Sequence, residues 1–194
     1  MWDYAPGATP IDADEAAGLI PKHITTQEQL NEWEQNNILQ AEQWLCKQNF
    51  KIVDISTAHF LQQLHGRMFN KTWRWAGQYR KTNKNIGVDW LCISVDLKIL
   101  LDDLQYQVNN KVFTPDELAA RFHHRLVAIH PFPNGNGRHA RMMADIVLLA
   151  IGAKRFSWGG RSLTGKSSTR KRYIDALREA DKLNYKDLIK FVRD

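Results

Sequence analysis

Cysteine is scarce in this sequence, which holds only Cys46 and Cys92 among 194 residues, far apart and in no Cys-x-x-Cys pair. A disulfide framework and a cysteine-based zinc or redox centre are therefore excluded. Each cysteine is expected to be a buried free thiol in a reducing compartment.

Long hydrophobic runs are also missing. The longest, Ile146 to Ala153, is far too short to span a bilayer. The first five residues, Met-Trp-Asp-Tyr-Ala, have neither a basic region nor an apolar core, so no secretory signal is recognised. We therefore expect a cytoplasmic protein with no membrane partner.

The composition is that of an ordinary globular domain, with 43% hydrophobic and 25% charged residues. The net charge of +6 favours nucleic-acid binding only weakly. Much of the excess lies in residues 155–172, which could face nucleotide phosphates, an acidic target or, as first choice, water. No helix-turn-helix or aromatic-basic platform is recognised, so direct nucleic-acid binding is not expected.

Proline and glycine mark residues 1–24 as an irregular N-terminal arm, with a helical turn near residues 13–19. Apolar periodicity and capping residues then predict a mainly α single domain over residues 25–194. The expected helices cover residues 25–48, 57–69, 95–109, 114–129, 137–152, 168–180 and 185–192. The helix over 137–152 is apolar around much of its surface, which indicates a central position.

Residues 77–88 are too short and polar for a helix and end in alternating apolar residues. They predict a small β-hairpin with its turn at residues 83–85. On these residues alone, an ordinary surface hairpin is the preferred interpretation.

The stretch from His130 to Arg141 is His-Pro-Phe-Pro-Asn-Gly-Asn-Gly-Arg-His-Ala-Arg. Its two prolines forbid a continuous helix, so it predicts helix, rigid loop, helix. Gly135 and Gly137 allow backbone amides to turn inward as an anion-binding nest at the start of the next helix. Arg138 and Arg141 share one face of its first turn. We call residues 130–137 the glycine loop.

A lone histidine such as His130 is more often structural. The adjoining phosphate cradle reverses that preference, because it supplies an electrophile beside which the imidazole can act as a base. His123, His124 and His139 are expected to be helix-face residues, and no acidic partner at zinc spacing makes them a metal cluster.

The stretch resembles the signature of Fic-domain proteins, His-x-Phe-x-(Asp/Glu/Asn)-Gly-(Asn/Lys)-Gly-Arg-x-x-Arg, at every constrained position. The opening segments also resemble the subgroup called mobile mystery protein B. The resemblance implies a Fic-type helical bundle with a small β-hairpin flap. In that family the flap binds the target's backbone, here through Thr82, Asn83, Lys84, Asn85, Ile86 and Gly87, as an exposed sheet edge can.

The resemblance further implies a protein adenylyltransferase. His130 would take a proton from a Ser, Thr or Tyr hydroxyl of a target protein, and that oxygen would attack the α-phosphate of ATP. The alternatives are transfer of another nucleotide or phosphate group, and a toxin–antitoxin-type nucleotide-binding regulatory module without turnover. The subgroup resemblance also suggests a DNA-binding companion protein.

The implied residue roles follow the signature. The amides of Gly135, Asn136 and Gly137 would hold α-phosphate oxygens. Arg138 would bind the β- and γ-phosphates, and Arg141 would lie nearer the γ-phosphate.

Asn134 stands where many family members have an acidic ligand for Mg²⁺. Its amide oxygen can bind a metal without supplying charge, so Mg²⁺ or Mn²⁺ would be held mostly by the nucleotide. Tyr173 and Asp181 fall where the adenosine pocket is expected, although a core tyrosine and a solvated aspartate are equally good interpretations.

Many Fic proteins also carry an inhibitory glutamate in a (Ser/Thr)-x-x-x-Glu-(Gly/Asn) motif. The nearest match is Glu34, with Leu30 in the Ser/Thr place. We expect Glu34 to pair with Arg141 and block the γ-phosphate; a solvated glutamate is the alternative interpretation.

Overall fold

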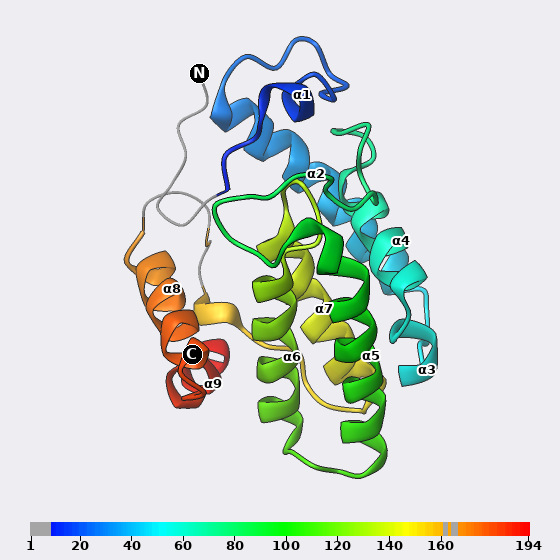
Figure 1. Ribbon diagram of the computed structural model, residues 1–194, viewed down its shortest axis with the longest axis vertical. Coiled ribbons are helices and arrows are strands. Elements are labelled where there is room, and N and C mark those ends of the chain that lie inside the picture. The colour runs from blue at the N-terminus through cyan, green and yellow to red at the C-terminus, as the bar shows by residue number, and fades with distance from the viewer. Residues whose placement is uncertain (1–8, 161–162, 164–166) are drawn as a thin grey trace.

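The computed structural model describes residues 9–160, 163 and 167–194, and its regular structure is helical (Figure 1). Within these residues no strand forms, and the one β-bridge joins Leu19 to Trp73. Two 3₁₀ turns, η1 (Trp90–Cys92) and η2 (Trp158–Gly160), accompany the helices. The α-helices are α1 (Ala13–Ala16), α2 (Gln27–Leu45), α3 (Ile52–Ile55), α4 (Ala58–Phe69), α5 (Ile93–Asn109), α6 (Pro115–Ile129), α7 (Asn136–Ala150), α8 (Ser168–Asp181) and α9 (Lys186–Arg193).

Hydroxyl side chains cap the starts of four helices. Thr26, Thr57, Thr114 and Ser167 each accept a hydrogen bond from the backbone N–H three residues later, at α2, α4, α6 and α8. These bonds satisfy amides that the helix itself leaves unpaired. They explain why the predicted starts agree with the structure to within two residues.

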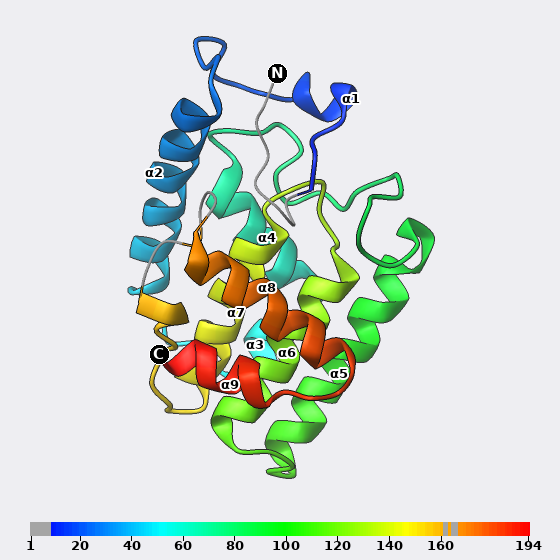
Figure 2. The same cartoon turned by 90° about the vertical axis from the view of Figure 1, so that its left-hand side faces the viewer.

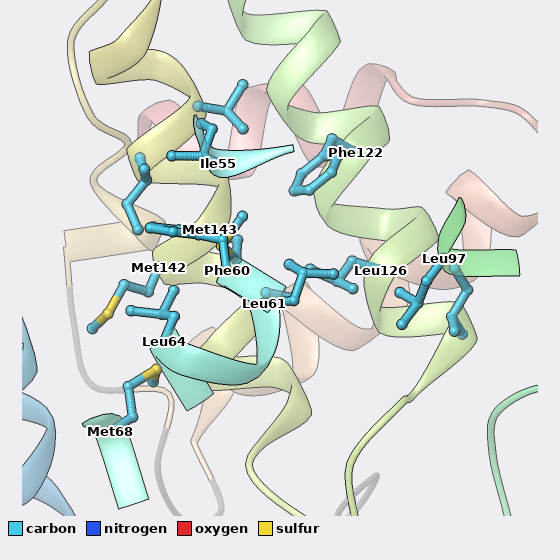
Figure 3. Close-up of a cluster of buried hydrophobic side chains, with 14 of the residues drawn as sticks. Ile55, Phe60, Leu61, Leu64, Met68, Leu97, Phe122, Leu126, Met142 and Met143 are labelled. Carbon is cyan, nitrogen blue, oxygen red and sulfur yellow. The ribbon is translucent and has the colours of Figure 1, made fainter. Parts of the chain in front are cut away.

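The pair α6 and α7 lies at the centre of the molecule, with α2 and α4 on one side and α8 and α9 on the other (Figures 1 and 2). Figure 3 shows side chains from α3, α4, α5, α6 and α7 meeting in the main core. A second apolar cluster joins α6 and α7 to α8 and α9. The central position expected for the helix over 137–152 is confirmed.

The cysteine prediction is wrong, because both thiols are exposed. Cys46 is the residue that ends α2, and Cys92 lies in the turn before α5. Neither position faces the core. Helix α3 is not among the helices predicted from the sequence, because it is only four residues long. Among the described residues, no helix has both the length and the apolarity needed to cross a membrane.

The predicted hairpin is also wrong, because residues 77–88 form an irregular loop without strand pairing. Backbone N–H groups that would pair the two strands of a hairpin are hydrogen-bonded instead to the glycine loop and to the last residue of α6. Arg80 N donates to Pro131 O at 2.9 Å, and Val88 N donates to Ile129 O at 3.4 Å. The side chain of Arg80 lies between the two ends of this loop and donates hydrogen bonds to the carbonyls of Thr82 and Val88.

Candidate active site

His130 ends α6 in a left-handed conformation, with φ 54° and ψ 59°. This region is uncommon for residues other than glycine and is strained. Pro131 follows and prevents the helix from continuing. The strained turn therefore projects the imidazole from the end of a rigid, buried helix.

Arg80 fixes that turn from the opposite side. It is 2% exposed, and its Nε donates to the carbonyl of His130 at 2.7 Å. Gly87 lies so close that a Cβ there would come within 2.8 Å of both the Arg80 guanidinium and the His130 Cβ. No local sequence pattern marks Arg80 as a positioning residue, because its role depends on contacts about fifty residues away.

The imidazole of His130 is 5% exposed. Burial first, and then the positive charge of Arg80, lower its pKa to about 4. The ring is therefore neutral at pH 7 and can accept a proton. Its Nε2 lies 2.9 Å from Thr9 Oγ1 of the N-terminal arm.

The glycine loop turns into α7 at Gly135, which has φ 77°. A Cβ at this position would lie 2.6 Å from the Phe69 ring, so the conformation and the space both require glycine. The buried Asn136 side chain closes the loop, accepting from Phe132 N at 2.8 Å and donating to Phe132 O at 2.7 Å.

The start of α7 has no side-chain cap, unlike α2, α4, α6 and α8. The N–H groups of Asn136, Gly137 and Arg138 lie in its first turn, and they donate to no acceptor in the described part of the chain. Such a helix start is an anion-binding site. The expected Gly135 amide is not among the open ones, because it donates to Asn134 Oδ1 at 2.7 Å.

Arg138 points from this first turn to Glu34 of α2, with Nη1 and Oε2 2.6 Å apart. The other carboxylate oxygen accepts from Trp73 Nε1 at 2.7 Å. Glu34 is 3% exposed, so the solvated alternative is wrong. The expected partner was also wrong: Glu34 pairs with Arg138, not Arg141, because the Trp73 indole directs the carboxylate towards the first arginine.

Arg141 is half-buried on the same helix. Burial and the nearby charges of Arg138 and Arg170 lower its pKa, while Tyr173 acts in the opposite direction. Arg138 and Arg141 of α7 and Arg170 of α8 thus lie near enough to affect one another's charge. Arg170 belongs to the basic segment 155–172, for which water was the preferred interpretation, so the only sequence signal was a charge run.

Comparison with known proteins agrees with this geometry. Residues 55–148, which include the whole glycine loop and both signature arginines, match the model of the Fic/DOC family. The chain contains a Fic/DOC domain.

Among curated relatives, the chain is 28% identical over 121 residues to protein adenylyltransferase Fic of Aedes aegypti. That match covers 61% of this chain and 23% of the mosquito protein. The chain is also 33% identical over 81 residues to protein adenylyltransferase fic-1 of Caenorhabditis elegans, a match that covers 40% of this chain and 16% of the nematode protein. The chain thus spans less than a quarter of the length of these relatives.

The fold of the Fic/DOC domain is similar to that of solved structures. A structure of BepC, an effector of Bartonella tribocorum with bound AMPPNP, superposes with a TM-score of 0.71 at 20% identity, covering 94% of this chain and 97% of that one. Fic-1 of C. elegans gives a TM-score of 0.68 at 23% identity, covering 92% and 51%.

In the Fic/DOC domain, the two side chains expected at an adenosine pocket, Tyr173 and Asp181, are hydrogen-bonded to histidines. The Tyr173 hydroxyl lies 2.9 Å from His123 Nε2, and Asp181 Oδ1 lies 2.8 Å from His124 Nε2. His123, His124 and His139 lie in α6 and α7 and are all buried, so the helix faces that carry them are packed inside the domain. Tyr173 is a core residue whose pKa burial raises to about 12.

Asn134 is engaged at both ends of its amide. Oδ1 accepts from Gly135 N, and Nδ2 donates to Thr9 O at 3.0 Å. Across the described residues no three acidic, histidine or cysteine side chains gather as metal ligands. At the glycine loop, Asn134 therefore offers a metal ion one neutral oxygen, which by itself does not make a Mg²⁺ site.

Proposed function

We propose that this chain is a protein adenylyltransferase that transfers AMP from ATP to a Ser, Thr or Tyr hydroxyl of a target protein. One observation carries the proposal: a neutral imidazole already lies at hydrogen-bonding distance from a hydroxyl, in the loop that leads to the uncapped start of α7, the helix that carries Arg138 and Arg141. The curated relatives with this function support it.

His130 is the proposed base. Its Nε2 takes the hydroxyl proton as the oxygen attacks the α-phosphorus, the bond to the β-phosphate oxygen breaks and pyrophosphate leaves. With a pKa of about 4 the ring is a weak base. The negative charge of bound phosphates would raise that pKa towards neutrality, which improves proton transfer.

The triphosphate would lie along the first turn of α7. The open amides of Asn136 and Gly137 suit α-phosphate oxygens, while Gly135 supplies the turn that aims them. Arg138 is the proposed ligand of the β- and γ-phosphates, and Arg141 lies one turn further towards the γ-phosphate. These groups neutralise charge and hold the nucleotide in line for attack.

The cation, Mg²⁺ or Mn²⁺, would be bound mainly through the nucleotide's phosphates. Asn134 Oδ1 is the one oxygen of the loop proposed to approach it, after releasing Gly135 N. When bound, the ion would neutralise phosphate charge.

A target would dock along residues 82–87, the docking segment. The backbone N–H groups of these residues donate to no described acceptor. They remain available to an extended peptide even though the segment itself forms no hairpin. Ile86 is 41% exposed and would contact the target's side chains.

Glu34 is proposed to restrain the enzyme. Its carboxylate forms an ion pair with the guanidinium of Arg138, which the β- and γ-phosphates would otherwise bind. A triphosphate must displace this buried ion pair before it can bind productively.

Tyr173 and Asp181 would border the adenosine once nucleotide binding releases their histidine partners. A cytoplasmic location, the mobile mystery protein B subgroup and a DNA-binding companion protein remain proposals from the sequence.

The test is mass spectrometry of the native chain and His130→Ala after incubation with ATP and Mg²⁺, together with acceptor proteins from a lysate. A gain of one AMP unit, seen only with the native chain, supports the proposal. Parallel reactions with α- and γ-labelled ATP distinguish AMP transfer from phosphate transfer. Label from the γ-position alone would replace the proposal with a kinase-type activity.

A further inference from the structure

Thr9 occupies the place of a substrate hydroxyl. Its Oγ1 lies 2.9 Å from His130 Nε2, across 121 residues of sequence, and the residue is 6% exposed. Its carbonyl accepts from Asn134 Nδ2 at 3.0 Å. Both contacts are with the glycine loop, so the backbone and the hydroxyl of Thr9 are fixed together at the proposed base.

The arm that carries Thr9 is anchored on the docking segment. Lys84 of that segment has its side chain 3% exposed and pairs with Asp12 at 2.5 Å and Glu15 at 2.6 Å. Two acidic residues of the arm thus hold the one lysine of the segment proposed to bind targets. Figure 2 shows the arm descending from α1 towards the loop between α6 and α7.

Further contacts fix the other end of the arm. Trp75 Nε1 donates to Glu15 O at 3.0 Å. Arg74 N donates to Gly18 O, and Ile20 N donates to Thr72 O, both at 2.9 Å. A Cβ on Gly18 would meet the Trp75 ring at 2.7 Å, so the arm lies directly against the indole. Contacts outside the glycine loop therefore also help to set the position of Thr9.

The local chain also suits an acceptor peptide. Pro10 restricts the preceding residue, Thr9, to an extended conformation. An extended peptide beside open backbone amides is the geometry of strand addition. No other hydroxyl side chain in the described part of the chain is hydrogen-bonded to His130.

We propose that Thr9 is a self-modification site, to which the chain transfers AMP in cis. The inference rests on the proposed adenylyltransferase function. His130 Nε2 accepts the Thr9 proton, a bond forms between Thr9 Oγ1 and the α-phosphorus of ATP, the bond from that phosphorus to the bridging oxygen breaks, and pyrophosphate departs. The proton then passes from His130 to solvent or pyrophosphate.

The experiment follows AMP on the intact full-length chain and on its tryptic peptides, with ATP and Mg²⁺. Cleavage after Lys22 releases residues 1–22, whose only hydroxyl side chains are Tyr4 and Thr9. The variants are Thr9→Val, which removes the hydroxyl at nearly constant shape, and Thr9→Ser, which keeps it. Thr25→Val is the matched control, because Thr25 is an exposed threonine before α2. Each is made in the native and the Glu34→Gln background.

We expect AMP on Thr9 in the native sequence, and a loss of at least about tenfold in the rate of total AMP incorporation into the chain in Thr9→Val. Thr9→Ser should retain incorporation and Thr25→Val should equal its parent. A first-order rate constant that is unchanged on dilution supports transfer in cis.

Three results would overturn the inference. AMP on Tyr4 or on residues beyond 22, with Thr9 unmodified, refutes the Thr9 site but leaves the adenylyltransferase proposal intact. A rate that falls with dilution refutes transfer in cis. Incorporation in neither background, either in this chain or in added lysate proteins, refutes the adenylyltransferase proposal and the Thr9 site together.

Discussion

Glu34 shows how one carboxylate can control a phosphate site at the residue scale. A buried carboxylate is costly unless it is paired and hydrogen-bonded. Here Arg138 and the Trp73 indole meet both requirements. The same contacts place a negative charge where the β- and γ-phosphates are proposed to bind, so the energy that stabilises the pair opposes the nucleotide.

Glu34→Gln should therefore tighten ATP binding. The amide keeps an oxygen for Trp73 Nε1 but removes the charge that competes for Arg138. We expect the dissociation constant for ATP to fall by about tenfold, equivalent to about 1.4 kcal/mol, as measured by isothermal titration calorimetry. Glu32→Gln is the control, because Glu32 is exposed on the same helix. Equal affinities for native chain and Glu34→Gln would contradict the restraining role.

The two glycines of the loop differ in what they require. Gly135 has a positive φ and no room for a Cβ, whereas nothing lies within 4 Å of a Cβ built on Gly137. Gly135→Ala should lower the free energy of unfolding by about 2–4 kcal/mol, through strain and overpacking. Gly137→Ala should leave it unchanged or raise it by up to about 1 kcal/mol, because alanine favours helix. Urea denaturation compares them; equal losses would refute the assignment.

At the scale of elements, the sequence predicted what local chemistry decides. Thr114, Pro115 and Glu117 specified the start of α6, and the glycine loop was found between two helices as expected. The hairpin failed because Arg80, a long side chain, bonds the carbonyls that a partner strand would have used. The contact of Thr9 with His130 had no local signal, since it joins segments 121 residues apart.

Helix α2 is held on α4 by a buried amide. Asn37 Nδ2 donates to Arg67 O at 3.0 Å, and Lys71 N donates to Asn37 Oδ1 at 2.9 Å. These bonds satisfy backbone groups at the end of α4, where the helix leaves carbonyls unpaired. They also fix the part of α2 that carries Glu34.

Asn37→Ala should lower the free energy of unfolding by about 2 kcal/mol, because it leaves a buried carbonyl and a backbone amide unpaired. Asn36→Ala is the matched control, an exposed neighbour for which the change should stay within about 0.5 kcal/mol. Hydrogen exchange at Lys71 N–H should accelerate only in Asn37→Ala. Similar effects of the two variants would show that the amide does not anchor α2.

At the scale of the whole molecule, the Fic/DOC domain is built around neutral histidines. Burial lowers the pKa of His123 and His139 to about 3 and that of His65 well below its usual value. His130 joins them, with a pKa of about 4. The ring centroids of His65 and Phe132 are stacked 3.8 Å apart, and His65 Nε2 lies 3.1 Å from Asn134 O. The charge state of His65 is therefore tied to the shape of the glycine loop.

These four histidines should make the fold sensitive to acid. Their pKa is lower in the folded chain than the ordinary 6.5, so below pH 6.5 the unfolded chain binds protons that the folded chain does not. Each therefore contributes stability that is present above pH 6.5 and is lost as pH falls below that value towards the lowered pKa, by up to about 1.4 kcal/mol per pH unit. Asp145 opposes this, because burial raises its pKa, but it is one group against four.

The summed loss approaches the whole stability of a typical domain, about 5–15 kcal/mol, so we expect the chain to unfold before pH 4. Urea denaturation at pH 7.5, 6.5, 5.5 and 5.0 measures the decline, which should begin near pH 6.5 and steepen below it. A constant slope against urea at each pH is the control that the same unfolding transition is being compared. If the free energy of unfolding stayed level down to pH 5, the pKa values of these imidazoles in the folded chain would have to lie near the ordinary 6.5, and burial would not be lowering them.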